Sequence, residues 1–326
     1  MNWKIKSWLQ RCCNFIPAGG IVYNQLQRQL GGLRQPEYMN KFKVQKKMAL
    51  MIQKHEAKIE GAEVLEVGTG WIPLVPIGFW LCGAARVRTY DLNRYLEMPL
   101  LRDALHWISN NSSTLATHYS EMVPENKLNA KLELLDNLKD RPADFLNEAK
   151  IEYHAPADAA LTGLPAESID IHFSANCFEH IPGEVLSRIL REARRVLKPE
   201  GLAVHHVDPS DHFSHCDPSI TSINFLRFEP DEWNCYSENR FAYHNRLRDS
   251  DYRRLFVESS LSISESEFEV DQRALSELKN SFPLALAYQN IPHDELCRYR
   301  LDYVARPGVT ADVVLQKESC RLQIAD

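Results

Sequence analysis

The chain has 326 residues, of which 44% are hydrophobic and 25% are charged, and its formal net charge is −6. This length is enough for one or two domains with a large core. No apolar run approaches the roughly 18–20 residues needed to cross a bilayer. The N-terminus also lacks the apolar stretch and cleavage site of a signal peptide. We therefore expect a cytoplasmic protein without a transmembrane segment.

The charge is spread unevenly along the chain. Residues 1–60 hold eleven basic and three acidic side chains, a net charge of +8, which leaves −14 for the remainder. An acidic body argues against a nucleic-acid partner. We expect the basic arm to pack on this body, with weak contact to a membrane surface as the alternative. Neither pattern predicts an oligomeric state. None of the eight cysteines forms a CxxC pair, so a zinc ribbon is not expected.

Helices are predicted for the first 60 residues, which we assign to an N-terminal helical arm. An amphipathic stretch begins at Trp3, and Pro17–Gly20 interrupts it. A second helix is predicted from about Pro36 to Ile59, with Phe42 and Met48 among its apolar positions.

Strand and helix patterns then alternate, which is typical of a parallel sheet. A helix is predicted from Gly183 to Leu197, and the sequence Lys198–Gly201 predicts a turn after it. The predicted strands are Glu63–Val67, Arg86–Tyr90, Ile151–His154, Ile169–Ala175 and Leu202–Val207, with Leu261–Ile263 and Arg300–Ala305 as the last two.

These elements predict an α/β fold, a Rossmann-like doubly wound sheet that is mostly parallel with an antiparallel last strand. The sheet domain spans residues 61–306, and residues 307–326 form a C-terminal tail. Residues 92–150 exceed what one connection between two strands needs, and they predict a helical insertion. Residues 208–260 follow the fifth strand and are predicted to form the substrate side.

The most informative motif is a glycine turn after the first strand. Glu66 ends the strand, and Gly68 and Gly70 follow. This arrangement places a nucleotide-like ligand over the end of a strand. A dinucleotide site needs a third glycine where Pro73 stands, so we favour a ligand without a pyrophosphate.

Acidic residues also follow other strands. Asp91 ends the second strand, about 20 residues after the glycine turn, and Asp158 follows the third. The carboxyl ends of parallel strands share one edge of a sheet, so these acids surround one crevice. A lone aspartate after a strand often caps a turn instead. We weigh the two interpretations evenly for Asp158 and favour ligand binding for Asp91.

Taken in order, these motifs resemble a class I S-adenosylmethionine-dependent methyltransferase of the type-11-like group, over roughly residues 62–207. The matching segments are Leu65–Gly70, Tyr90–Asp91, Ala157–Ala159, Asn176–His180 and Arg194–Gly201.

The resemblance implies S-adenosyl-L-methionine as the cofactor and an enzyme that transfers its methyl group. In such a protein Glu66 and the glycines line the methionine part, Asp91 binds the ribose hydroxyls, Asp158 accepts from the adenine amino group, and Asn176 lies near the sulfonium. The cofactor-binding residues implied in this way are Glu66, Gly68, Thr69, Gly70, Asp91, Leu92, Asp158, Ala159, Asn176 and Cys177.

Two departures from the family pattern bear on these expectations. Ile72 stands where the family often has a third glycine, so we expect a wider turn or a displaced helix. Pro73 fits a first helical position. Asn176 is not followed by Pro-Pro-aromatic, the pattern of methyltransferases that act on planar amides and nucleobases, which argues against nucleic-acid N-methylation.

The histidine-rich segment 205–217 is the second unusual feature. Adjacent His205 and His206 on a strand face opposite sides of the sheet. The loop that follows carries Asp208, His212 and His215 above the predicted cofactor. We interpret them first as polar residues that cap turns.

The second interpretation of this segment is a general base that takes a proton from a hydroxyl acceptor. The base is then His212 or Asp208, with His180 as the alternative. Metal ligation through His212 and His215 ranks third, and we predict no metal.

Residues 241–248 are dense in aromatic and hydrogen-bonding side chains, which suits a polar ring such as a sugar. For Phe241 and Leu247 we favour an ordinary packing interface between this segment and the core. We predict O-methylation of a small-molecule or saccharide-like acceptor. The alternatives are an NAD(P)-dependent oxidoreductase on a similar fold and a non-catalytic binding protein that retains the methyltransferase fold.

Overall fold

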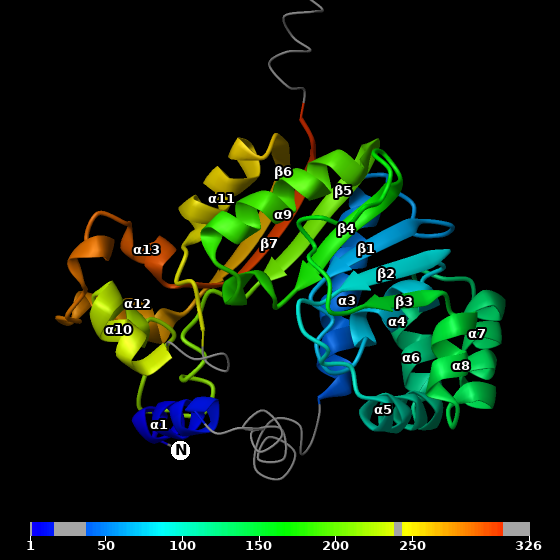
Figure 1. Cartoon of the computed structure of the whole chain (residues 1–326), viewed down its shortest axis with the longest axis horizontal. Coiled ribbons are helices and arrows are strands. Elements are labelled where there is room, and N and C mark those ends of the chain that lie inside the picture. The colour runs from blue at the N-terminus through cyan, green and yellow to red at the C-terminus, as the bar shows by residue number, and fades with distance from the viewer. Residues whose placement is uncertain (1, 16–36, 238–242, 309–326) are drawn as a thin grey trace, which may run out of the picture.

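A mixed seven-stranded sheet organises the molecule (Figure 1). The computed structural model describes residues 2–15, 37–237 and 243–308. The strand order is β3-β2-β1-β4-β5-β7-β6. The first five strands are parallel, β7 is antiparallel to β5, and β6 is antiparallel to β7. The strands are β1 (Glu63–Val67), β2 (Arg86–Tyr90), β3 (Ile151–His154), β4 (Ile169–Ala175), β5 (Leu197–Val207), β6 (Leu261–Val270) and β7 (Arg298–Pro307).

This sheet confirms the predicted fold class, and β1 to β4 have the predicted bounds. The turn predicted at Lys198–Gly201 is wrong, because these residues belong to β5. The pairing register between β4 and β5 shifts here: Ile169 pairs with Leu197, but Ile171, two residues later, pairs with Leu202. The proline and glycine that suggested a turn are accommodated where β5 loses its regular register with β4.

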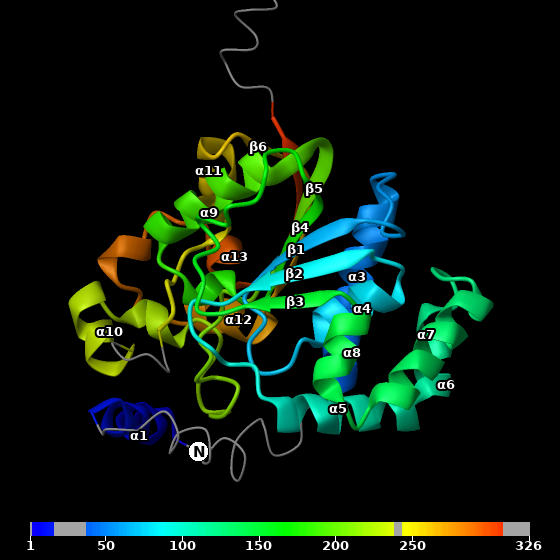
Figure 2. The same cartoon turned by 45° about the vertical axis from the view of Figure 1, so that its right-hand side comes forward.

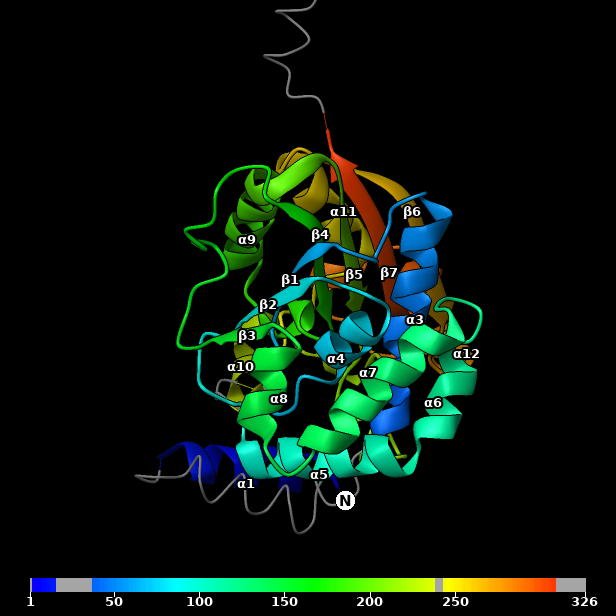
Figure 3. The same ribbon diagram turned by 90° about the vertical axis from the view of Figure 1, so that its right-hand side faces the viewer.

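Helices cover both faces of the sheet (Figure 3). On one face α9 and α11 lie side by side, and on the other α3 packs against α4. The amphipathic pattern of α9 explains its position, because Ile189, Ala193 and Val196 are buried while two arginines occupy its last turn. The bounds are α3 (Tyr38–Lys54), α4 (Leu74–Leu81), α9 (Gly183–Val196) and α11 (Asp249–Glu258).

The predicted insertion 92–150 forms a group of helices beside α4, at one end of the sheet (Figure 1). Leucines at helical spacing on α7, such as Leu128, Leu132 and Leu135, join the core of this group. The helices are α5 (Met98–Asn110), α6 (Ser112–Tyr119), α7 (Glu125–Leu138) and α8 (Pro142–Glu148).

A lobe with its own apolar core lies at the opposite end (Figure 2). We call it the acceptor lobe. Trp3 of α1 is only 5% exposed, and its ring lies 4.9 Å from Tyr236 and 5.7 Å from Phe213, centroid to centroid. The elements of the acceptor lobe are α1 (Trp3–Phe15), η2 (Asn224–Arg227), α10 (Pro230–Ser237), α12 (Gln272–Lys279), η3 (Leu286–Tyr288) and α13 (His293–Leu296).

The first helix therefore packs on the body of the protein, as expected for the basic arm. Hydrogen bonds contribute as well, since the Trp3 backbone amide donates to Asp217 at 2.8 Å and the Ser7 hydroxyl donates to the Tyr236 carbonyl. The predicted interruption at Pro17–Gly20 and residues 309–326 of the predicted tail lie outside the described residues. Within the described ranges, we find no helix with both the length and the apolar character to cross a membrane.

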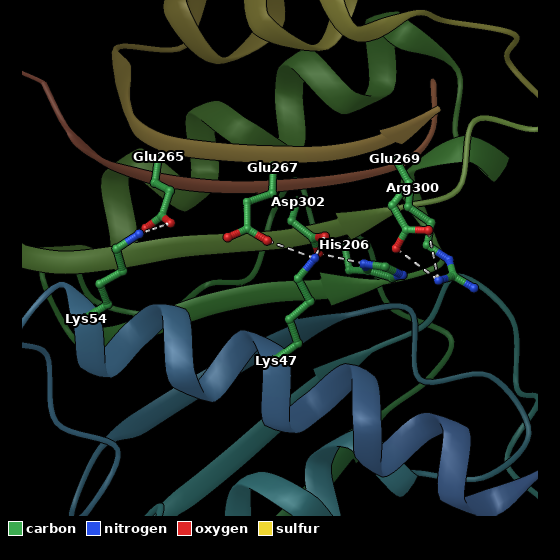
Figure 4. Close-up of polar contacts among 8 residues, drawn as sticks. All are labelled: Lys47, Lys54, His206, Glu265, Glu267, Glu269, Arg300 and Asp302. Carbon is green, nitrogen blue, oxygen red and sulfur yellow. Dashed lines mark hydrogen bonds and ion pairs between the residues drawn. The ribbon is translucent and has the colours of Figure 1, made fainter. Parts of the chain in front are cut away.

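A row of ion pairs joins α3 to the antiparallel strands (Figure 4). Glutamates at alternate positions of β6 face α3, so that Lys54 pairs with Glu265 and Lys47 with Glu267. Lys47 also reaches the buried Asp302 of β7, at 2.7 Å. The row fixes α3 over the end of β5, where the candidate site begins.

Candidate functional site

The glycine turn after β1 brings two strand ends into contact. Gly68 has φ +82°, and a Cβ atom built on it would lie 2.2 Å from Sγ of Cys177, which follows β4. Gly70 also has a positive φ, of +70°, with open space around its α-carbon. Only glycine accommodates both the backbone conformation and the close approach at position 68. The turn begins where the sequence predicts, and α4 starts one residue after Pro73.

Two buried carboxyl groups flank this turn. Glu66 is 2% exposed and accepts a hydrogen bond from the Thr89 hydroxyl at 2.6 Å, and Asp91 accepts one from the Gly70 amide at 3.1 Å. In the described part of the chain, neither carboxyl forms an ion pair with a basic side chain. Burial raises the pKa of Glu66 to about 8 and that of Asp91 to about 6. The crevice is therefore acidic and suits a ligand that carries positive charge and hydroxyl donors.

The third strand places the adenine-side candidates at the surface. Asp158 is exposed, and its side chain accepts from the Ala160 amide at 2.9 Å, so it caps its own turn. Ala159 beside it is buried. Leu92, after Asp91, is 72% exposed. The turn-capping alternative thus holds for Asp158 in this structure, without excluding a ligand contact.

Asn176 follows β4, next to the Cys177 that approaches Gly68. It has φ +56°, a left-handed conformation that asparagine tolerates better than most residues, and its amide donates to the His206 carbonyl at 2.9 Å. It also lines a cleft of about 1190 Å³ that extends away from the glycine turn. Side chains from α3, the loop after β5 and both antiparallel strands line this cleft, among them Lys41, Lys47, His206, Asp208, His212, His215, Glu269, Arg273 and Arg300.

A buried acid orients one histidine of the cleft. Nδ1 of His206 lies 2.6 Å from Oδ1 of Asp302, which is 1% exposed (Figure 4). The hydrogen bond from His206 and the contact with Lys47 lower the pKa of Asp302 despite its burial. His205 points to the other face, where its ring stacks on Phe178. This confirms that the two adjacent histidines face opposite sides.

Asp302 was not among the residues predicted from the sequence. It stands opposite His206 in the register between β5 and β7, about a hundred residues away in the chain. The signal that was available is an acidic residue inside an otherwise apolar strand, Arg300–Ala305. A buried charge requires a partner, so its presence in a central strand predicts one.

The predicted bases of the histidine segment also lie together, at the edge of the cleft. His180 follows β4 in η1 (Phe178–His180), and its ring centroid lies 5.0 Å from that of His212. Asp208 lies 3.6 Å from Nε2 of His212. His244 approaches both rings, at centroid distances of 4.8 and 4.1 Å. Burial and the neighbouring imidazoles lower the pKa of His212 well below its ordinary value.

Glu179 is a second residue that the sequence analysis did not select. It is 1% exposed, and burial raises the pKa of its carboxyl group to about 8. The sequence signal that was available is that Glu179 belongs to the motif Asn176–His180. Nothing in the local sequence indicates that η1 turns its side chain toward the interior.

Comparison with known proteins gives one family match. Residues 130–205 match the family model described as a methyltransferase domain. No curated protein matches the chain.

Solved structures of similar fold were compared as well. A protein from Galdieria sulphuraria assigned as a sarcosine dimethylglycine methyltransferase has 15% identity and a TM-score of 0.45, over 82% of this chain and 86% of that one. Phosphoethanolamine N-methyltransferase 2 of Haemonchus contortus, in complex with S-adenosyl-L-methionine, has 12% identity and a TM-score of 0.46, over 81% and 53%. With TM-scores below 0.5, these similarities carry no argument about the reaction.

The family match ends within β5, and the strand order around it places the glycine turn, Asp91 and Asn176 at one edge of the sheet. Among the described residues, Glu66 and Asp91 form no ion pair with a basic side chain, so this end of the sheet does not suit a dinucleotide phosphate. Residues 130–205 of the chain are thus similar to a methyltransferase domain, and the fold is consistent with a class I methyltransferase that uses S-adenosyl-L-methionine.

Proposed function

We propose that the enzyme methylates a hydroxyl group of a small-molecule or saccharide-like acceptor bound in the 1190 Å³ cleft. The cofactor supplies an electrophilic methyl group on a positively charged sulfur. The residues that would hold it are Glu66, Gly68, Thr69, Gly70, Asp91, Leu92, Asp158, Ala159, Asn176 and Cys177.

The acidic crevice supports this assignment of the cofactor. Two buried carboxyl groups with raised pKa values gain from a cationic ligand, because its charge stabilises their ionised forms. The exposed side chain of Leu92 offers an apolar surface to the adenine ring. Asn176 lines the cleft and precedes Cys177, which approaches Gly68 of the glycine turn, so the methyl donor and acceptor would meet beside it.

The single observation that carries the proposed reaction is the pairing of His206 with Asp302. A carboxylate that accepts from Nδ1–H leaves Nε2 of the imidazole as a proton acceptor. His206 lines the cleft, and its backbone carbonyl accepts a hydrogen bond from the Asn176 backbone amide. A base at this position takes the proton of an acceptor hydroxyl as its oxygen attacks the methyl carbon.

Asp302 would then stabilise the imidazolium that forms. It holds the ring in one orientation, and Lys47 keeps the carboxylate ionised. The bases predicted from the sequence, His212, Asp208 and His180, lie at the same cleft. Among the described residues, neither of these histidines has a carboxylate within hydrogen-bond distance as His206 has. We therefore place His206 first among the candidate bases.

The test is methyl transfer to a panel of monosaccharides, uronic acids and phenols, with the product located by NMR. We expect His206→Gln to lower kcat by about 10²–10⁴-fold. The Kd for S-adenosylhomocysteine, measured by calorimetry, should stay unchanged. Asp302→Asn should lower kcat with little effect on KM, since it misorients the imidazole.

His106→Gln, on the exposed face of α5, is the matched control and should keep the wild-type rate. If His206→Gln keeps the wild-type kcat, His206 is not the general base. Methyl groups found only on nitrogen or carbon would contradict O-methylation.

Two further assignments are part of the proposal. The division into an arm (residues 1–60), a methyltransferase domain (61–306) with its insertion (92–150) and substrate side (208–260), and a tail (307–326) describes functional units. A cytoplasmic location stays a prediction from the sequence.

A further inference from the structure

Three histidines from separate segments converge at the edge of the acceptor cleft. His180 lies in η1, His212 in the loop after β5, and His244 in the segment before α11. One ring nitrogen from each lies within 4.8 Å of the others. The rings are inclined to one another at 55–77°, so they do not simply stack. Such convergence of imidazole nitrogens is the ligand set of a transition-metal site.

The hydrogen bonds leave ligating nitrogens available. Nδ1 of His180 lies 3.0 Å from the Tyr243 carbonyl, which can only accept, so Nδ1 carries the proton and Nε2 keeps its lone pair. A carbonyl behind a histidine is the usual means of orienting a metal ligand. Nε2 of His212 is shielded from solvent and has no hydrogen-bond partner among the described residues. A polar atom buried in this way is costly unless something else satisfies it.

The local charge also favours a cation. The carboxylate of Asp208 lies 3.6 Å from Nε2 of His212 and 3.5 Å from Nε2 of His215. No lysine or arginine of the described chain forms an ion pair with Asp208. Its negative charge therefore adds to the attraction of a positive ion at the three imidazoles.

We propose that His180, His212 and His244 bind a divalent transition-metal cation, with Zn²⁺ as the best match. Zinc–nitrogen bonds of 2.0–2.1 Å in tetrahedral geometry place ligand nitrogens about 3.3 Å apart. The nitrogen separations, which are up to 4.8 Å, therefore need to shorten by as much as about 1.5 Å through side-chain rotation. Three histidines leave a fourth position open, as in catalytic zinc sites.

The open position would serve the acceptor. His212 and Asp208 line the cleft that His206 also lines, so an oxygen ligand of the metal would lie on the acceptor side of the site. A hydroxyl or carboxylate oxygen of the acceptor suits that position. This last step rests on the proposed function, whereas cation binding does not.

The binding test uses the full chain without a polyhistidine tag, stripped of metal by a chelator. Co²⁺ is titrated in and followed by the visible absorption of four-coordinate cobalt, and Zn²⁺ is then added in competition. We expect one equivalent of Co²⁺, displaced by Zn²⁺. The wild-type melting temperature should rise with Zn²⁺, because a ligand that binds the native state stabilises it.

Three single variants, His180→Gln, His212→Gln and His244→Gln, should each weaken Co²⁺ binding by at least about 10-fold. His215→Gln is the matched control, since its ring stacks on His212 at 4.9 Å but lies outside the triad. His180 is exposed, so its variant should fold even if another does not.

Absence of stoichiometric Co²⁺ binding in the wild type would overturn the proposal. Equal loss of affinity in His215→Gln and the triad variants would do so too. Neither outcome bears on methyl transfer, which is measured separately with His206→Gln.

Discussion

Asp91 has a structural role in the glycine turn and, in the proposed function, a binding role. Its carboxyl group accepts from the Gly70 amide and so closes the glycine turn, while burial raises its pKa to about 6. The acid is therefore ionised at neutral pH but close to protonation. A ribose hydroxyl donates best to a carboxylate, so ligand binding and proton binding at Asp91 are in competition.

The affinity for S-adenosylhomocysteine should consequently depend on pH. Above pH 7 Asp91 is ionised, so it should contribute no further change in affinity as the pH rises. Below about pH 6 protonation removes the charged acceptor, and the Kd should rise about 10-fold per pH unit. Calorimetric titration at pH 5, 6 and 7 measures this rise.

Asp91→Asn is the reference for this titration. It should bind about 10–100-fold more weakly at pH 7, as expected for a lost hydrogen bond to a charged group. It should lack the change in affinity centred near pH 6, whereas any pH dependence that arises from Glu66, with its pKa of about 8, should remain in both proteins. An identical pH profile in the wild type and Asp91→Asn would assign the effect to another group.

At the scale of elements, the ion pairs between α3 and the antiparallel strands differ in burial (Figure 4). Lys54 is 67% exposed, and its partner Glu265, which is 12% exposed, also pairs with His55. Lys47 instead reaches Asp302, whose side chain is 2% exposed. Exposed pairs contribute little to stability, whereas the loss of one partner of a buried charge leaves that charge uncompensated.

Lys47→Met should therefore destabilise the protein, by about 1–3 kcal/mol in the free energy of unfolding. His206 still contacts Asp302, which keeps the loss below that of a fully orphaned charge. Lys54→Met, one pair further along the same helix, should leave the unfolding free energy nearly unchanged. Urea denaturation followed by circular dichroism compares the two. Equal losses of unfolding free energy in the two variants would contradict the expectation that the burial of Asp302 makes the Lys47 pair the more important one.

The same strands show what the sequence does and does not predict. The parallel strands β1–β4 are short apolar segments bounded by turns, and their bounds follow from pattern alone. The sequence predicts β6 only over Leu261–Ile263, because Glu265, Glu267 and Glu269 interrupt the apolar pattern after it. In the structure the strand extends to Val270. These glutamates are compatible with a strand only because basic side chains of α3 and β7 face them. The local sequence pattern does not indicate partners that lie far away in the chain.

The candidate site divides in the same way. The crevice residues Glu66, Gly68 and Asp91 are predictable because the chemistry is local: an acid or glycine at the end of an apolar strand. The pairing of His206 with Asp302 depends on the register of two strands remote in sequence. The position of His244 beside His180 depends on the path of a loop. Neither contact leaves a periodic signal in the chain.

At the scale of the whole molecule, α1 closes the acceptor lobe. Trp3 is buried among aromatic side chains from residues 213–236, whereas Trp8 on the same helix is 64% exposed. The Trp3 ring also contacts Phe213, the neighbour of His212 in the chain. The first turn of the chain is thus part of the support of the histidine segment.

Trp3→Ala should lower the unfolding free energy by about 3–5 kcal/mol, the range for large aromatic side chains removed from a core. Trp8→Ala should change it by no more than about 0.5 kcal/mol. Thermal and urea unfolding of both variants test the difference. Similar losses in both would mean that α1 is not held by Trp3.

The docking of α1 has a consequence for biosynthesis. Phe213 and Trp233, against which Trp3 packs, leave the ribosome more than 200 residues after it. At about 5–20 residues per second, this interval lasts roughly 10–45 s. During that time a basic helix with two unburied tryptophans is available to chaperones, and the nascent chain cannot complete the acceptor lobe before most of the sheet has been made.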